Sequence, residues 1–103
     1  MSGAANPARG EASLRVRGET LVLRPSFAAL VAAEGELGPL FALVERAADG
    51  RLGLGEMVGL FWHCLTERPM AREDFAEGVA DAGLAAAMPA LKLLLGQILG
   101  GRG

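Results

Sequence analysis

The sequence predicts a mostly α-helical domain of the α+β class, in which an N-terminal two-stranded β-hairpin is followed by four or five short packed helices. Residues 11–24 alternate apolar and polar side chains around a glycine, which is the pattern of a half-buried hairpin. From residue 27 onward, apolar side chains recur at helical spacing between Gly and Pro residues. Of the 103 residues, 51% are hydrophobic, which is enough for one modest core.

The hairpin is expected to have strands over 11–17 and 20–24. Gly18 suits the first central position of a two-residue type II′ turn, with Glu19 at the second. In this register the apolar side chains fall on one face without adjustment. The expected pairs on that face are Val16 with Leu21 and Leu14 with Leu23. Because a lone hairpin is marginal in water, helices must cover this face.

The first two helices are predicted from the positions of their capping residues. Ser26 can cap the free amides of the first helix, and Gly35 and Gly38 are expected to end it. Pro39 fits the first turn of the second helix, and Gly50 is a natural C-terminal cap for it.

Three more helices are expected in the second half of the chain. They cover about residues 56–68, 71–80 and 86–99. Pro69 stops the first of these, and the second is acidic. Pro89 is tolerated only if it lies in the first turn of the last helix.

The length suits one domain, which we expect over residues 10–99, between a flexible tail at 1–9 and a frayed end at 100–103. The start of the sequence lacks the pattern of a secretory signal, and no apolar stretch reaches the roughly 20 residues of a membrane-spanning helix. The single cysteine cannot form an internal disulfide. We therefore expect a cytoplasmic protein that does not enter a membrane.

Two short motifs suggest chemistry that their setting does not favour. His63 and Cys64 are neighbours on a predicted helix, where adjacent side chains diverge by about 100° and cannot pair as nucleophile and base. Gly50–Gly55 is glycine-rich like a phosphate loop, but it lacks the Lys-Ser/Thr ending and follows no strand. One His and one Cys cannot fill a structural zinc site. We expect no enzyme activity, no catalytic residue, and no metal or cofactor site.

Charged side chains gather on one predicted helix and in the hairpin region. The acidic group is read as a solvated helix face, with a site for a cation or basic partner as the alternative. Its members are Glu73, Asp74, Glu77 and Asp81. The basic group is expected on the solvent side of the hairpin or at the rim of a protein contact. Its members are Arg9, Arg15, Arg17 and Arg24. With a net charge of −2, direct binding to nucleic acid is not expected.

The most informative apolar residues lie in the third and last predicted helices. Leu93, Leu94 and Leu95 are consecutive, so the apolar surface of the last helix extends beyond one stripe. That surface is either core or a contact with another chain. The predicted partner-binding residues are Phe61, Trp62, Leu94 and Leu95, with Arg15 and Arg17 as rim charges.

The order and spacing of several segments resemble the gene transfer agent family, a group of small proteins related to phage tail assembly chaperones. These segments are Asn6–Glu11, Gly18, Leu23–Glu34, Leu37-Gly38, Gly50–Leu65 and Gly83-Leu84. One departure is Gly55, where a polar helix cap would be usual. The resemblance covers nearly the whole chain.

This resemblance implies a non-enzymatic role in building a phage-like particle that bacteria encode. Tail assembly chaperones coat the tape-measure protein and recruit tail-tube subunits, so those two proteins are the implied partners. The alternatives are a structural tail component that stays in the particle, and an unrelated small protein-interaction module. Weak self-association is a further open alternative. A small enzyme would require a deep polar pocket around His63 or Glu34.

Overall fold

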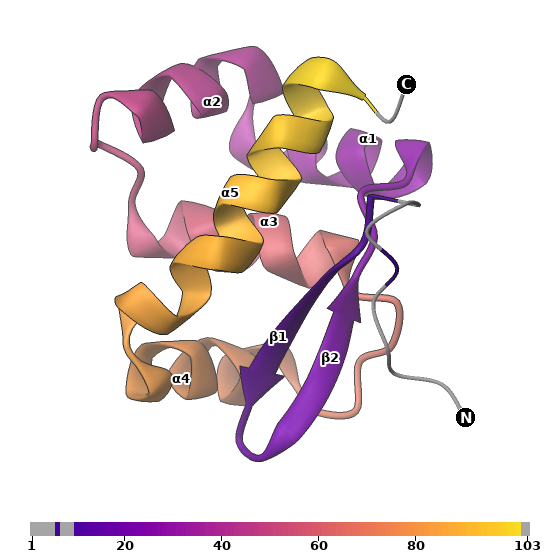
Figure 1. Cartoon of the computed structure of the whole chain (residues 1–103), viewed down its shortest axis with the longest axis vertical. Helices are drawn as coiled ribbons and strands as arrows, with labels where there is room; N and C mark the ends of the chain where they lie inside the picture. Colours follow the sequence, from indigo (N-terminus) through magenta and orange to yellow (C-terminus); the bar gives the residue numbers. More distant parts are fainter. Residues whose placement is uncertain (1–5, 7–9, 102–103) are drawn as a thin grey trace.

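A computed structural model describes residue 6 and residues 10–101, and it shows a two-stranded antiparallel hairpin followed by five helices (Figure 1). The hairpin strands are β1 (Ala12–Val16) and β2 (Glu19–Leu23). The helices are α1 (Phe27–Leu37), α2 (Leu40–Ala48), α3 (Leu54–Cys64), α4 (Arg72–Ala82) and α5 (Leu84–Gly100). The predicted fold class is confirmed. Apart from Asn6, the predicted tail lies outside the described residues, as do residues 102–103 of the predicted frayed end.

The predicted hairpin register is wrong by one turn position. The turn is formed by Arg17 and Gly18, which both have positive φ, at 52° and 81°. Two positive φ values define a type I′ turn, whose twist matches that of the flanking strands. The observed pairs are Ala12 with Leu23, Leu14 with Leu21, and Val16 with Glu19. Moving the turn by one residue shifts the pairing by two, so the same side chains still point into the core.

The third helix ends at Cys64, four residues earlier than predicted, because the following segment pairs with the outer edge of β2. Arg24 donates its backbone N–H to the Cys64 carbonyl at 2.7 Å, and Thr66 donates to the Val22 carbonyl at 3.0 Å. Leu65 and Leu23 form an isolated antiparallel bridge. These bonds replace the helical bonds that residues 65–68 would otherwise have made.

The caps of α1 and α2 follow the prediction with two exceptions, at Gly35 and Pro39. The Ser26 hydroxyl accepts the Ala29 N–H at 3.2 Å, and Gly38 ends α1 with φ 87°. Gly35 does not end α1, because it lies inside the helix. Helix α2 begins at Leu40, so Pro39 is its N-cap and not part of its first turn, and Gly50 stands one residue beyond the C-cap Asp49 with φ 72°.

The last helix begins at Leu84 rather than at residue 86, which places Pro89 in its second turn. Gly83 has φ 93° and joins α4 to α5 without a longer loop, so the helix can start two residues earlier. Pro89 has no N–H to donate to the carbonyl four residues before it. That residue, Ala85, is exposed, so water can satisfy its carbonyl.

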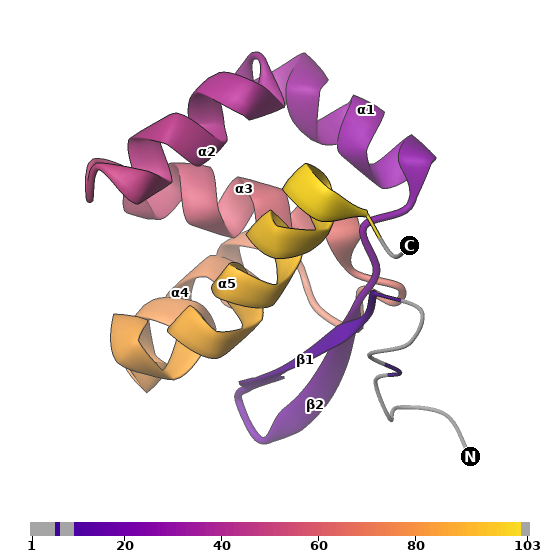
Figure 2. The ribbon, with the colours of Figure 1, turned by 45° about the horizontal axis from the view of Figure 1, so that its top comes forward.

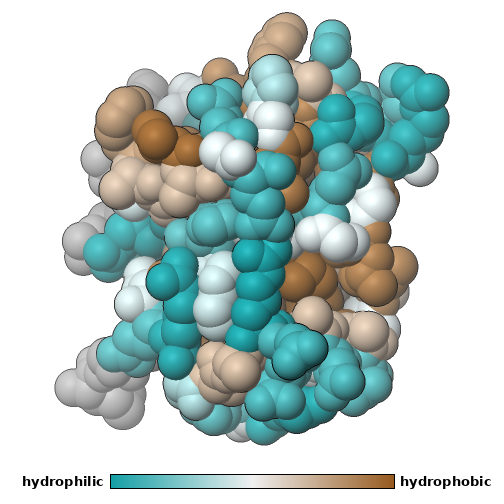
Figure 3. Space-filling view, turned by 180° about the vertical axis from the view of Figure 1, so that it is seen from behind, coloured by the Kyte–Doolittle hydropathy of each residue, from teal (hydrophilic) through white to brown (hydrophobic). Residues whose placement is uncertain are grey.

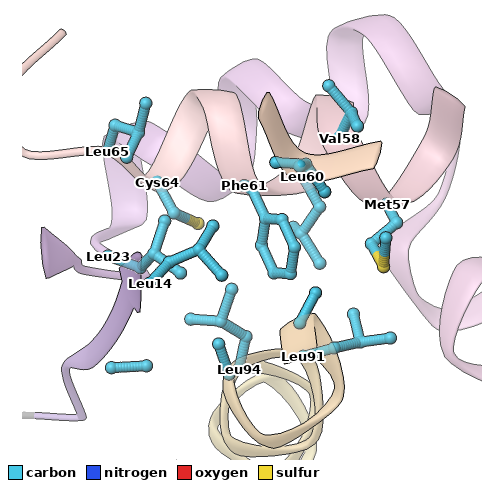
Figure 4. Packing of buried hydrophobic residues seen from close by; sticks show 14 of the residues in the cluster. Leu14, Leu23, Met57, Val58, Leu60, Phe61, Cys64, Leu65, Leu91 and Leu94 are labelled. Atoms are coloured by element: carbon cyan, nitrogen blue, oxygen red, sulfur yellow. The ribbon is translucent and has the colours of Figure 1, made fainter. Parts of the chain in front are cut away.

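The core lies where α3 and α5 face the inner side of the hairpin. Figure 4 shows Phe61 of α3 pointing between Leu14 and Leu23 of the hairpin and Leu91 and Leu94 of α5. In the two ribbon views, α1 and α2 lie on one side of α3 and α4 lies on the other (Figures 1 and 2). Strand β1 packs against α4 and α5, which supply the cover that the hairpin needs.

Candidate interaction surface

The six residues predicted to contact a partner do not form one surface. Phe61 and Leu94 have 0% of their surface exposed and belong to the core, so they do not reach solvent in this fold. Trp62 and Leu95 are partly buried and pack against the core cluster. Arg15 and Arg17 are exposed on the hairpin. A partner could contact Phe61 or Leu94 only if the fold opened. Contact through the two partly buried residues and the two arginines stays a prediction.

The indole of Trp62 makes contacts within the molecule, to Phe75 and Arg68. Its ring lies 5.7 Å from the Phe75 ring, at an interplanar angle of 50°. The Arg68 guanidinium stands over the indole at 5.0 Å and also donates two hydrogen bonds to the Trp62 carbonyl. Arg68 therefore covers the ring and satisfies a carbonyl in the last turn of α3.

The acidic helix face serves partly to hold the hairpin turn. Arg17 lies 3.6 Å from Asp74 and 3.1 Å from Glu77, both on α4. Arg15, on β1, instead bonds to the Thr20 hydroxyl and the Gly18 carbonyl, each at 3.4 Å. Two of the four predicted acidic residues therefore anchor the hairpin turn to α4, and Glu73 and Asp81 are exposed.

A three-residue charge cluster joins α1, α3 and α4. Glu36 bonds to Nε2 of His63 at 2.8 Å, and Arg72 donates to the same Glu36 oxygen at 2.8 Å. Hydrogen bonding from Arg72, and then from His63, lowers the pKa of Glu36 to about 2. This cluster was not predictable from the sequence, because its members are far apart along the chain and match no motif.

Glu36→Gln is expected to lower the free energy of unfolding at pH 7 by about 1 kcal/mol. The value is modest because the side chains of Glu36 and Arg72 are both partly exposed. The folded-state pKa lies below the ordinary value of 4.5, so this stabilisation is present above pH 4.5 and is lost toward pH 2. Urea unfolding between pH 7 and 3 should show a steeper loss for wild type than for the variant. Glu67→Gln, at an exposed site, serves as control. Parallel pH curves for wild type and Glu36→Gln would contradict this assignment.

Cys64 and His63 point in different directions. Burial raises the pKa of the Cys64 thiol to about 12, and its side chain faces the core (Figure 4). His63 instead meets Glu36, so the two side chains are not arranged as a nucleophile and its base.

The Cys64 thiol should therefore react slowly in the folded protein. A pKa near 12 rather than 9 leaves about 1000-fold less thiolate at neutral pH. Labelling with a disulfide reagent should be at least 100-fold slower in buffer than in denaturant. Equal rates in both conditions would show that the thiol is accessible.

An apolar groove lies where α2 ends and where α3 and α5 begin. Its volume is about 210 Å³, and it is bordered by Gly50 and Gly53 of the glycine-rich loop that resembles a phosphate loop in sequence. The Gly53 N–H donates to Oε1 of Glu56 at 3.0 Å, so this amide caps α3. The apolar lining comes mainly from Leu52, Leu54, Met57, Leu84, Met88 and Leu91. The groove offers contact to an apolar side chain rather than to an anion.

A second apolar surface lies on α1. Phe27 is 85% exposed and Val31, one turn later, is 50% exposed. Seen from behind, brown apolar side chains gather over α1, and a separate group lies on the side where α2 ends (Figure 3). Phe41 on α2 and Leu99 on α5 are also exposed. Neighbouring exposed apolar residues such as Phe27 and Val31 are candidates for contact with another chain, whereas single exposed ones are common on any protein surface.

Within residue 6 and residues 10–101, no cluster of three or more His, Cys, Asp or Glu could hold a metal ion. In the same part of the chain, no single helix is long and apolar enough to cross a membrane. The pairs α1 with α2 and α4 with α5 reach that length and composition only together, across bends of 76° and 111°.

The sequence of the chain matches a family of phage tail proteins. A family model described as "Phage tail tube protein, GTA-gp10" matches residues 9–101. The chain belongs to this family, and it is therefore a phage tail-related protein of the gene transfer agent type. The resemblance seen in the sequence is confirmed at this level. No curated protein and no solved structure shows significant similarity to the chain.

Proposed function

We propose that the chain is a non-enzymatic tail assembly chaperone of a gene transfer agent or prophage, acting in the cytoplasm on tape-measure and tail-tube proteins. The family match over residues 9–101 carries this proposal. Large apolar side chains at the surface, Phe27 and Phe41 among them, support it, because apolar helices of an unassembled partner need cover from water. Reversible contact shields those helices until the tail is built.

The direct test is co-expression with the tape-measure and tail-tube proteins from the same gene cluster, followed by affinity purification. The proposal expects at least one of them to copurify. Arg15→Glu should weaken capture several-fold at low salt, because Arg15 is the exposed rim charge that makes only long bonds of its own. Lys92→Glu, an equal charge change on α5, is the control. Absence of both partners at stoichiometric expression would refute the chaperone role.

A structural tail component is the second candidate, because the family description itself names a tail tube protein. The two roles differ in whether the protein stays in the finished particle. Quantitative mass spectrometry of purified particles separates them. A chaperone should be scarce or missing, whereas a tube component should be present in many copies per particle.

A further inference from the structure

The two outer edges of the hairpin differ in what lies beside them. The edge of β2 is paired, because Thr66 donates to the Val22 carbonyl and Arg24 donates to the Cys64 carbonyl. Figure 1 shows the segment after α3 running beside β2. The sheet has only two strands in the part of the chain that the structure describes, and no segment of that part other than β2 pairs with β1.

The hairpin register decides which backbone groups of β1 point away from β2. Val16 and Glu19 flank the two-residue turn and exchange backbone hydrogen bonds, and bonded pairs then alternate along the strands. Leu14 is therefore bonded to β2, whereas Ser13 and Arg15 turn their N–H and C=O groups outward. We call these four groups of Ser13 and Arg15 the open edge. A row of unpaired backbone groups is a template for another strand.

The tightest helix contacts that the glycines mark lie beyond the two ends of the open edge. A β-carbon on Gly78 of α4 would stand 2.4 Å from Cγ1 of Val16, and one on Gly10 would stand 2.8 Å from Oε1 of Gln97 on α5. The two residues of the open edge lie between these points, and both are exposed. Because buried backbone groups without partners are rare, we infer that water reaches the open edge and that another backbone can replace this water.

The charge beside the open edge favours an acidic strand. Arg15 is exposed, and its two bonds, to the Thr20 hydroxyl and the Gly18 carbonyl, are long and go to neutral groups. Within the described residues no carboxylate pairs with Arg15, whereas Arg17 in the turn faces two acidic residues of α4. Opposite charges on neighbouring strands attract and like charges repel, so an acidic side chain beside Arg15 fits this position.

We propose that the open edge of β1 receives an extended segment of a partner protein as a third strand, with an acidic side chain of that segment beside Arg15. Main-chain hydrogen bonds hold such a strand, and the ion pair sets its register and excludes basic segments. A second copy suits the edge less well, because two open edges would bring two Arg15 side chains to the same face of the sheet. The inference states how a partner binds and does not depend on the chaperone role.

Amide hydrogen exchange of the full chain, followed by NMR, tests the proposal on the wild type. The probe is a peptide with blocked ends in which Thr and Val alternate around one central Glu, and the control peptide has Lys at that position. In the free protein the Ser13 and Arg15 amides should exchange rapidly. A millimolar excess of the Glu peptide should slow both at least threefold and leave the Thr20 amide, on the opposite edge, unchanged. The Lys peptide should bind several-fold more weakly.

Three variants separate the backbone contact from the charge. Ser13→Pro removes an N–H from the open edge, where proline is tolerated because that N–H faces solvent, and it should abolish binding of the Glu peptide. Thr20→Pro removes an N–H from the opposite edge and should bind as the wild type does. Arg15→Glu should reverse the preference, so that the Lys peptide binds more tightly than the Glu peptide. If circular dichroism shows that Ser13→Pro is unfolded, the wild-type exchange rates and Arg15→Glu decide.

Several results would overturn the proposal. These are Ser13 and Arg15 amides that the Glu peptide leaves unchanged, and equal affinity for both peptides in the wild type and in Arg15→Glu. Protection that appears without peptide and rises with protein concentration would assign the open edge to a second copy instead.

The same measurements keep this proposal apart from the chaperone role. If tail proteins copurify equally with the wild type and with folded Ser13→Pro, and the peptide protects neither amide, the third strand is refuted and the chaperone role stands. Protection by the Glu peptide without capture of any tail protein would do the reverse.

Discussion

Phe61→Ala is expected to lower the free energy of unfolding by about 3–5 kcal/mol, a large share of the total stability of a domain this size. The Phe61 ring has no exposed surface and fills the space between the hairpin and α5 (Figure 4). Alanine would leave a cavity there, because α3, α5 and the strands hold one another apart through their other buried side chains. Chemical denaturation followed by circular dichroism measures the loss.

Phe41→Ala provides the matched control. It removes the same ring from a site that is 68% exposed, so its effect should stay within about 0.5 kcal/mol. The pair of variants also clarifies any binding experiment, because the sequence predicts Phe61 as a partner contact. If Phe61→Ala loses binding, stability must be measured before the loss is assigned to an interface. A variant that keeps full stability and loses only binding would contradict the placement of Phe61 in the core.

The hairpin shows how far a local pattern can predict structure. Alternation of apolar and polar residues over 11–24 is a property of the strands themselves, so the strands and their buried face were predictable. The turn was not, because Gly18 suits both the first position of a type II′ turn and the second position of a type I′ turn. The observed type I′ turn includes Arg17, and Arg17 pairs with Asp74 and Glu77 of α4. The turn type therefore goes together with a tertiary contact that the local pattern does not contain.

The end of α3 depends on a contact that no local pattern contains. Pro69 correctly marks a position that the helix cannot pass, yet the helix stops at Cys64. The backbone of residues 64–66 bonds to β2, about 40 residues earlier in the chain. Such pairing requires both segments to be in place, so a sequence read in short windows does not reveal it.

The candidate surfaces were harder to predict than the elements. Residues 27–33 are apolar on every side, so periodicity cannot tell which side of α1 is buried. In the structure Ala33 is buried and Phe27 is exposed, the reverse of what side-chain size alone would suggest. The groove is assembled from parts of three helices and a loop, and this convergence is a property of the packed chain. The predicted partner-binding residues therefore include Phe61 and Leu94, which are core residues, and do not include Phe27 and Leu84, which are exposed.

Gly78→Ala is expected to destabilise the fold by about 1–3 kcal/mol, although alanine favours helices over glycine. Helix α4 approaches β1 so closely that a β-carbon on Gly78 would stand 2.4 Å from Cγ1 of Val16 and 3.1 Å from Cγ of Arg17. Val16 is fully buried and cannot turn aside without disturbing its neighbours. Separating the two elements would also loosen the ion pairs that Arg17 makes with α4.

Gly96→Ala should have the opposite sign, and the comparison isolates the contact from helix propensity. Both glycines are inside helices, but a β-carbon on Gly96 would meet nothing within 4 Å. Alanine there should raise the free energy of unfolding by up to about 1 kcal/mol through propensity alone. If thermal unfolding showed both variants stabilised by the same amount, α4 would not be held against β1 as tightly as the structure requires. If only Gly78→Ala is destabilised, the cost comes from the close approach of α4 to the hairpin.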